Sequence, residues 1–180
     1  VTGVQTCALP ICWGVEDMSH ILAILVENQS GVLTRVAGLF SRRGYNIDSL
    51  AVGQTHDPGV SRMTIVVDGD SRVIDQVVKQ LDKLVDVIEV SDISGDEHLD
   101  RELVLIKVEA EPEVRGEIMQ IVDIFRARIV DIGHHSLIIE CTGDAGKIRA
   151  IENSLKPFGI LELVRTGKIA MVRGQKYGEG

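Results

Sequence analysis

The segment HILAILVENQSGVLTRVAGLF, at residues 20–40, decides the fold expected of this chain. Its first part, HILAILVE, is a continuous apolar run of strand length. The polar NQSG at residues 28–31 ends the strand. Apolar residues then recur at the three- and four-residue spacing of a helix packed on a core, namely Val32, Leu33, Val36, Ala37, Leu39 and Phe40. The segment therefore predicts a buried strand, a short polar loop and an amphipathic helix.

The rest of residues 18–93 extends this pair into a β-α-β-β-α-β unit. RRGYN ends the first helix, with Gly44 at its C-terminal cap. IDSLAVGQ and SRMTIVVDG are predicted strands, joined as a hairpin through the Pro-Gly turn THDPG. Asp70 or Ser71 caps a second helix, and LVDVIEVSDI is the fourth strand. The apolar face of the second helix is Val73, Ile74, Val77, Val78 and Leu81.

The second half repeats the pattern after SGDEHLD, a charged connector at residues 94–100. Over 101–174 we expect strands at ELVLIKVEA, RIVDIG and SLIIECTG, and one last extended segment, ILELVRTGKIAMVRG. Two helices alternate with them, and residues 175–180 are a polar tail. The predicted fold class is α+β, with two ferredoxin-like units that each place two helices on one face of an antiparallel sheet. The helical stripes are Val114, Ile118, Ile121, Val122 and Phe125, then Ile148, Ile151 and Leu155.

The first strand carries no polar alternation from Ile21 to Val26. A strand of this kind expects both of its faces to be covered. One explanation is that sheets pair back to back or edge to edge between copies, so we expect a dimer or a larger assembly.

Composition excludes several classes of protein. A formal net charge of −8 opposes binding to nucleic acid, which requires a basic face. No apolar run approaches the roughly 18 residues needed to cross a membrane. An odd cysteine count favours a reducing, cytoplasmic setting.

Nucleophile-elbow, P-loop and dinucleotide-binding motifs are missing from the sequence. Cys141, inside an apolar strand, is interpreted as an inert buried thiol, and His134-His135 as a turn or edge feature.

Residues 1–17 fit neither a metal site nor a targeting peptide. TCALPICWGVED, at 6–17, holds Cys7 and Cys12, but no further ligands lie at a recognised spacing, so we expect no metal. No Lys or Arg precedes the apolar residues, as a signal or transit peptide would require. The stretch VTGVQTCALPI resembles translated sequencing-adapter read-through. We therefore interpret residues 1–17 as a non-native or disordered leader.

The loop ENQSGVLTRV offers the best candidate site. Gly31 and Val32 fall at a helix N-terminus, where free N–H groups and the helix dipole attract a carboxylate. Glycine lets a ligand approach the backbone, and Asn28 offers both an acceptor and a donor to a zwitterionic amino acid. Asn46, just before the second strand, is expected near the same end of the sheet. The alternative is an ordinary capped turn in which Ser30 holds the helix.

Extended stretches of this sequence resemble the small regulatory subunit of acetohydroxyacid synthase, also called acetolactate synthase. The resemblance runs from Met18 to about Gly174. It implies an N-terminal ACT domain at residues 18–93 that binds amino acids, and a C-terminal small-subunit domain at 101–174. The stretches that carry it include SHILAILVENQSGVLTRVAGLFSRRGYNIDSLAVG, SRMTIVV, LVDVIEV and RELVLIKV.

The resemblance also implies a regulatory task rather than catalysis. The small subunit would activate a separate catalytic subunit, which carries thiamine diphosphate, Mg²⁺ and FAD, and would confer feedback inhibition by valine in branched-chain amino-acid synthesis. No cofactor is expected on this chain: Gly69-Asp70 is present, but Asn28, Asn46 and Asn153 are not paired as a thiamine-diphosphate motif requires.

The resemblance assigns site residues as well. Asn28, Gly31 and Val32 match the family's effector loop, and Asn46 its partner position, reached from the other protomer of a homodimer formed through ACT domains. Leu33 and Ile47 are candidate apolar neighbours of the valine side chain. The alternative is a free-standing ACT-type amino-acid sensor without an enzyme partner.

Overall fold

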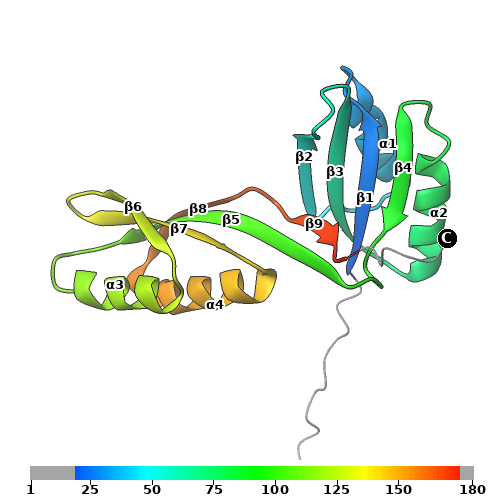
Figure 1. The fold of residues 1–180 in the computed structure, drawn as a ribbon. Coiled ribbons are helices and arrows are strands. Elements are labelled where there is room, and N and C mark those ends of the chain that lie inside the picture. The colour runs from blue at the N-terminus through cyan, green and yellow to red at the C-terminus, as the bar shows by residue number, and fades with distance from the viewer. Residues whose placement is uncertain (1–18, 175–180) are drawn as a thin grey trace, which may run out of the picture.

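The computed structural model describes residues 19–174, which form two sheet-and-helix units joined by one long strand that extends from the sheet of the second unit (Figure 1). The leader at 1–17 and the tail at 175–180 lie outside the described residues. None of the described helices is long and apolar enough to cross a membrane.

The first unit is a four-stranded antiparallel sheet in the order β2-β3-β1-β4, with both helices on one face. This arrangement confirms the predicted ferredoxin-like fold and the hairpin through THDPG. The Asp70 side chain caps α2 by accepting from Arg72 N. The elements are β1 (Ser19–Glu27), α1 (Val32–Arg42), β2 (Ser49–Gln54), β3 (Val60–Asp68), α2 (Ser71–Leu81) and β4 (Val87–Asp92).

The second unit repeats the topology in the order β6-β7-β5-β8. A short strand, β9, then returns to pair with the beginning of β5. The elements are β5 (His98–Glu109), α3 (Arg115–Ile124), β6 (Arg128–Ile132), β7 (Ser136–Gly143), α4 (Ala145–Leu155), the 3-10 turn η1 (Lys156–Phe158), β8 (Ile160–Arg165) and β9 (Ile169–Val172).

Two predictions about the second half were wrong in detail. The connector expected over 94–100 is strand from His98 onward, because these residues pair with β9. The last extended segment is two strands, β8 and β9, since the chain turns at Gly167, where φ is +84°. The left-handed backbone conformation there suits a residue without a Cβ.

The strand β1 is buried on both faces, as its uniform apolar sequence predicts. Leu22, Ile24 and Val26 lie in the core under α1 and α2. On the opposite face, Ile21 and Ala23 join a small cluster, completed by Val66, Ile93 and Ala170. Because Ala170 belongs to β9, part of the cover expected from a second copy comes from the chain itself.

The ribbon formed by β9 and the start of β5 fastens the second unit to the first. Arg62 Nη2 on β3 donates to the Ala170 carbonyl over 3.0 Å. Lys168 N donates to Ser49 Oγ over 2.9 Å. In Figure 1 β9 lies beside the sheet of the first unit, at the beginning of the long β5 strand. The two units therefore meet through named polar contacts around an apolar patch.

Helices α1 and α3 end in the same hydrogen-bonded turn with different residues. In α1, Gly44 N donates to Ser41 O, and the following N–H donates to Phe40 O. In α3, Arg126 N donates to Asp123 O, and the next N–H donates to Val122 O. This Schellman pattern requires a left-handed residue, and φ is +72° at Gly44 but +49° at Arg126. Arginine therefore stands where glycine is favoured.

Replacing Arg126 with glycine is expected to raise the free energy of unfolding by about 1 kcal/mol, because the left-handed backbone then lacks a Cβ. Urea unfolding of the two proteins measures the difference. Arg126→Ala is the matched control: it removes the same side chain but keeps the strain, so it should bring no gain. Equal stabilisation by alanine would contradict the explanation.

A polar cluster ties β1 to the end of β4. His20 Nδ1 lies 2.7 Å from Asp92 Oδ2, and Ser94 donates to the same carboxylate through its N–H and its hydroxyl. The Ser94 hydroxyl oxygen also accepts from Ile21 N over 2.7 Å. Burial raises the pKa of Asp92, but the hydrogen bonds from Ser94 and His20 outweigh it and leave this pKa below its ordinary value.

A lowered pKa in the folded state means that the unfolded chain binds this proton more readily. The stabilisation from Asp92 is therefore present at neutral pH and is lost as the pH falls below about 4. We expect Asp92→Asn to destabilise the protein at neutral pH, with a difference that shrinks towards about pH 3. Urea unfolding across this range measures it, and Asp123→Asn, at an exposed position on α3, is the control. A difference independent of pH would contradict the assignment.

Candidate functional site

The loop between β1 and α1 presents an uncapped helix N-terminus. Gly31 is the N-cap residue with φ +86°, and no side chain caps it. The predicted alternative, in which Ser30 holds the helix, is therefore not observed. The first bond of the helix runs from Arg35 N to Gly31 O over 3.0 Å. The backbone N–H groups of Val32, Leu33 and Thr34 find no acceptor within 19–174.

The electrostatics of this loop favour an anion. The first turn of α1 holds no acidic residue. The Arg35 side chain lies close to Gly31, since its Nη1 would be 3.9 Å from a Cβ added at that glycine. The Nε of Arg35 pairs with Asp86 over 2.7 Å. A helix N-terminus carries a partial positive charge, whereas the charge of the Arg35 guanidinium is balanced by Asp86. The loop can therefore receive a carboxylate on backbone N–H groups.

Asn28 fixes the loop to the neighbouring β2–β3 turn. Its N–H donates to Gly59 O over 2.8 Å, and its Nδ2 donates to Pro58 O over 3.0 Å. The exposed side chain keeps its Oδ1 free of donors among the described residues. This oxygen is suited to accept from an ammonium group.

Asn46 does not lie at the same end of the sheet as Asn28, and that prediction was wrong. Ser49, at the start of β2, is in register with Val66, which pairs with Ile21 at the start of β1. Asn28 follows the other end of β1, so the two amides are separated by roughly 20 Å along the strand. Asn46 is exposed and donates through Nδ2 to Asp48 Oδ1 over 2.8 Å.

The predicted apolar residues of the site also lie at opposite ends of the first sheet. Val32 is 2% exposed and belongs to the core, so only its backbone N–H faces the loop. Leu33, 43% exposed, is the accessible apolar side chain at the helix start. Ile47 packs partly on the first core, next to Asn46 at the opposite end. One chain alone therefore does not bring all six predicted residues together.

The corresponding loop of the second unit has different chemistry. The strand-to-helix segments of the two units align without insertions or deletions. Leu22 and Val104 are equivalent core positions, and so are Val36 and Ile118. The same alignment places Ala110 opposite Asn28 and an acidic residue, Glu113, opposite Gly31.

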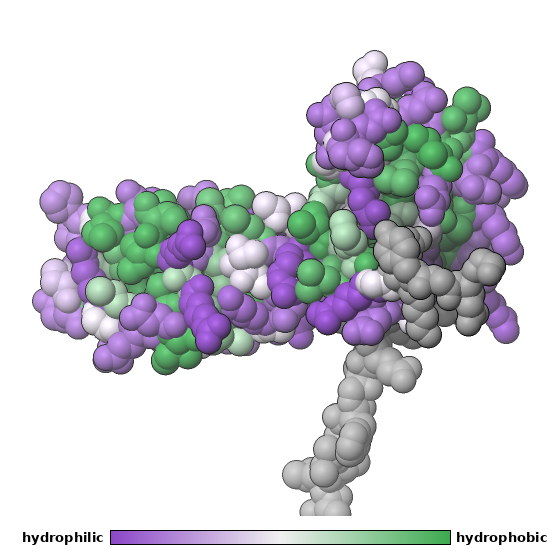
Figure 2. Space-filling view, in the orientation of Figure 1, coloured by the Kyte–Doolittle hydropathy of each residue, from purple (hydrophilic) through white to green (hydrophobic). Residues whose placement is uncertain are grey.

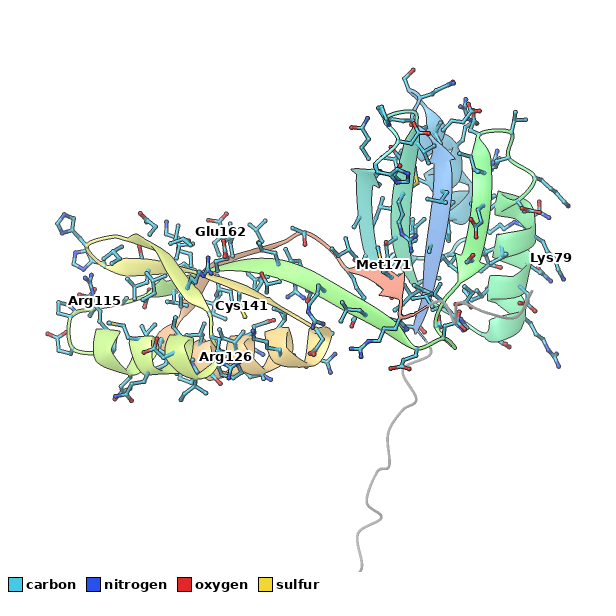
Figure 3. The ribbon with its side chains drawn as sticks, in the orientation of Figure 1. Lys79, Arg115, Arg126, Cys141, Glu162 and Met171 are labelled. Carbon is cyan, nitrogen blue, oxygen red and sulfur yellow. The ribbon has the colours of Figure 1, made fainter. Side chains whose placement is uncertain are left out.

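An arginine already occupies the carbonyl groups around this second loop. Arg115 donates to the carbonyls of Ala110, Gly133 and His134 over 3.0, 2.7 and 2.6 Å (Figure 3). Glu111 pairs with His135 over 2.8 Å. His134-His135 lies in the bend between β6 and β7, in agreement with its prediction as a turn or edge feature. With Glu111 and Glu113 beside it, the α3 N-terminus does not favour a carboxylate ligand. The anion-receptive loop belongs to the first unit.

The described residues offer neither a reactive thiol nor a metal centre. Cys141 is buried in the second core, and burial raises the pKa of its thiol despite the nearby Lys147 charge (Figure 3). A thiol in this setting is a poor nucleophile. Within 19–174, no cluster of three or more His, Cys, Asp or Glu side chains is arranged to hold a metal ion.

Comparison with protein families identifies both units. A family model described as the AHAS small subunit-like ACT domain matches residues 22–89. A second, described as the small subunit of acetolactate synthase, matches residues 101–174. The chain belongs to the acetolactate synthase small-subunit family.

Individual relatives agree with this membership. A probable acetolactate synthase small subunit of Archaeoglobus fulgidus is 57% identical over 159 residues, covering 88% of this chain and 99% of that protein. The acetolactate synthase small subunit of Aquifex aeolicus is 51% identical over 161 residues, covering 89% and 84% of the two chains. The crystal structure of the small subunit from Thermotoga maritima shares 43% identity with a TM-score of 0.80, over 87% of this chain and 98% of that one.

Proposed function

We propose that this chain is a regulatory subunit that activates a catalytic acetolactate synthase subunit and makes it sensitive to valine. The observation that carries the proposal is the uncapped, acid-free α1 N-terminus at Gly31, with Asn28 and Arg35 beside it. Relatives named as small subunits of acetolactate synthase support a large catalytic partner. Thiamine diphosphate, Mg²⁺ and FAD belong, in this proposal, to that partner.

Valine would use three groups of the effector loop, which we define as residues 28–33. Its carboxylate accepts from the free N–H groups at the start of α1, where glycine leaves room for close approach. Its ammonium donates to Asn28 Oδ1. Its branched side chain lies against exposed Leu33. The positive end of the helix thus selects the carboxylate, and the amide selects the ammonium.

A homodimer would complete this site. β2 is an edge strand of the first sheet, and its second half, Val52 to Gln54, pairs with β3 alone. The turn at Gly167 packs beside Ser49 and Leu50 at its start. Two such edges paired antiparallel about a two-fold axis place the start of one β2 beside the end of the other. Asn46 and Ile47 of one copy would then face the β2–β3 turn of its partner, to which Asn28 is bound. A shared site accounts for candidates that lie at opposite ends of one chain.

Inhibition follows from linkage between two sites. Valine can lower the activity of the complex only if it binds the less active arrangement more tightly than the active one. Because the ribbon of β5 and β9 joins the effector-binding unit to the second unit, a shift of the first sheet would reach the second directly.

Gly31→Asp is expected to abolish inhibition by valine while activation of the catalytic subunit persists, since the new carboxylate repels that of valine. Gly31→Asn is the matched control: it has the same shape without the charge, and both residues tolerate a positive φ. We expect asparagine to weaken valine binding less than aspartate, by about tenfold or more between the two. Titrating valine into the reconstituted enzyme measures this.

Full inhibition of the Gly31→Asp enzyme would contradict the proposed site. The same reconstitution tests the alternative of a free-standing sensor. A chain that binds valine but activates no cognate catalytic subunit would favour the sensor instead.

A further inference from the structure

A cavity of about 400 Å³ lies where the β5–β9 ribbon meets the first sheet, on the face that α1 and α2 leave uncovered. Strands β2 and β3 form one wall, and β9 with the start of β5 forms the other (Figure 3). Most of the lining is apolar, and Figure 2 places apolar surface at this junction of the two units. The main apolar residues are Ala51, Val52, Leu99, Ile169 and Met171. This size and character are typical of small-molecule sites.

Arg62 lines this cavity with an incompletely satisfied guanidinium. Its Nη2 donates to Ala170 O, but its Nε is buried and has no hydrogen-bond partner in the described part of the chain. No carboxylate of residues 19–174 forms an ion pair with it. Its neighbours across the adjacent strands are Leu25 and Gly53. Arg62 is half-buried, but its Nε is withdrawn from water without a partner, and a bound anion would offset the cost of that burial.

The charged residues around the cavity indicate which class of anion it can bind. Arg101 lines it as a second guanidinium, and no Asp or Glu does. The groove on the other side of Arg62, by contrast, is lined by Glu89 and Asp96. A cavity without an acid has no partner for an ammonium group, whereas guanidinium groups pair well with a carboxylate.

We propose that this cavity binds a short-chain monocarboxylate with an apolar tail, and not a zwitterionic amino acid. The carboxylate pairs with the Arg62 guanidinium, and the tail lies against Ala51, Leu99 and Met171. This site is separate from the effector loop and does not depend on valine binding there. Because its walls come from both units, its ligand would hold the β5–β9 ribbon on the first sheet.

Isovalerate is the probe, applied to the full chain by isothermal titration and thermal unfolding. Leucine has the same apolar tail with an added ammonium group, and isoamyl alcohol has it without the charge. We expect isovalerate to bind and to raise the melting temperature, with both comparators weaker by about tenfold or more. Equal binding of the alcohol, or no binding of isovalerate at millimolar concentration, would overturn the proposal.

Two variants test the position of the site. Gly53→Leu places an apolar side chain in the cavity beside Arg62, and a Cβ built there meets no atom within 4 Å, so the change should abolish isovalerate binding. Gly116→Leu, the same change at an open position on α3, should leave binding intact. Arg62→Gln keeps a donor for Ala170 O but removes the charge, so binding should fall about tenfold or more.

Unchanged isovalerate binding by Gly53→Leu would overturn the assignment, whether or not Arg62→Gln folds. If isovalerate fails to bind and Gly53→Leu instead changes the sedimentation coefficient, the cavity is an interface between copies and the proposal is wrong.

Discussion

The structure depends on the burial of β1 from both sides. Leu22, Ile24 and Val26 face the helices, while Ile21 and Ala23 face β9 of the second unit. A central strand with no polar face cannot be left open to water on either side. The helices satisfy one face within the first unit. The other face is covered by the ribbon of β5 and β9. Burial of the apolar side chains of β1 therefore also fixes how the second unit is attached to the first.

Two units with one topology carry different chemistry at the same turn. The strand-to-helix loop of the first unit has a glycine at the helix start and leaves N–H groups free. The second has Glu111 and Glu113 near its helix start and an arginine that takes the local carbonyl groups. Duplicated folds can therefore divide their tasks through a few loop residues, because the core residues that specify the fold are elsewhere.

The strands and helices followed from hydrophobic periodicity, since the core positions recur with the spacing that each element requires. The division of the last extended segment into β8 and β9 did not, because it depends on the left-handed turn at Gly167 and on docking against the first sheet. The predicted topology alone is enough to place Asn46. Because β2 runs parallel to β1, the loop before β2 lies at one end of the sheet and the loop after β1 lies at the other end. The cavity beside Arg62 arises from tertiary contact alone, and no local pattern predicts it.

The central claim is that the effector site is shared between two copies, with Asn28 from one and Asn46 from the other. Valine binding by differently tagged, co-purified pairs of Asn28→Ala and Asn46→Ala chains tests it most directly. Each variant alone should lose valine binding, because both of its sites lack one amide. A mixed pair retains one complete site, so it should bind valine with wild-type affinity at half the wild-type stoichiometry. Mixed pairs that bind no better than their parents, or normal binding by Asn46→Ala alone, would contradict a shared site.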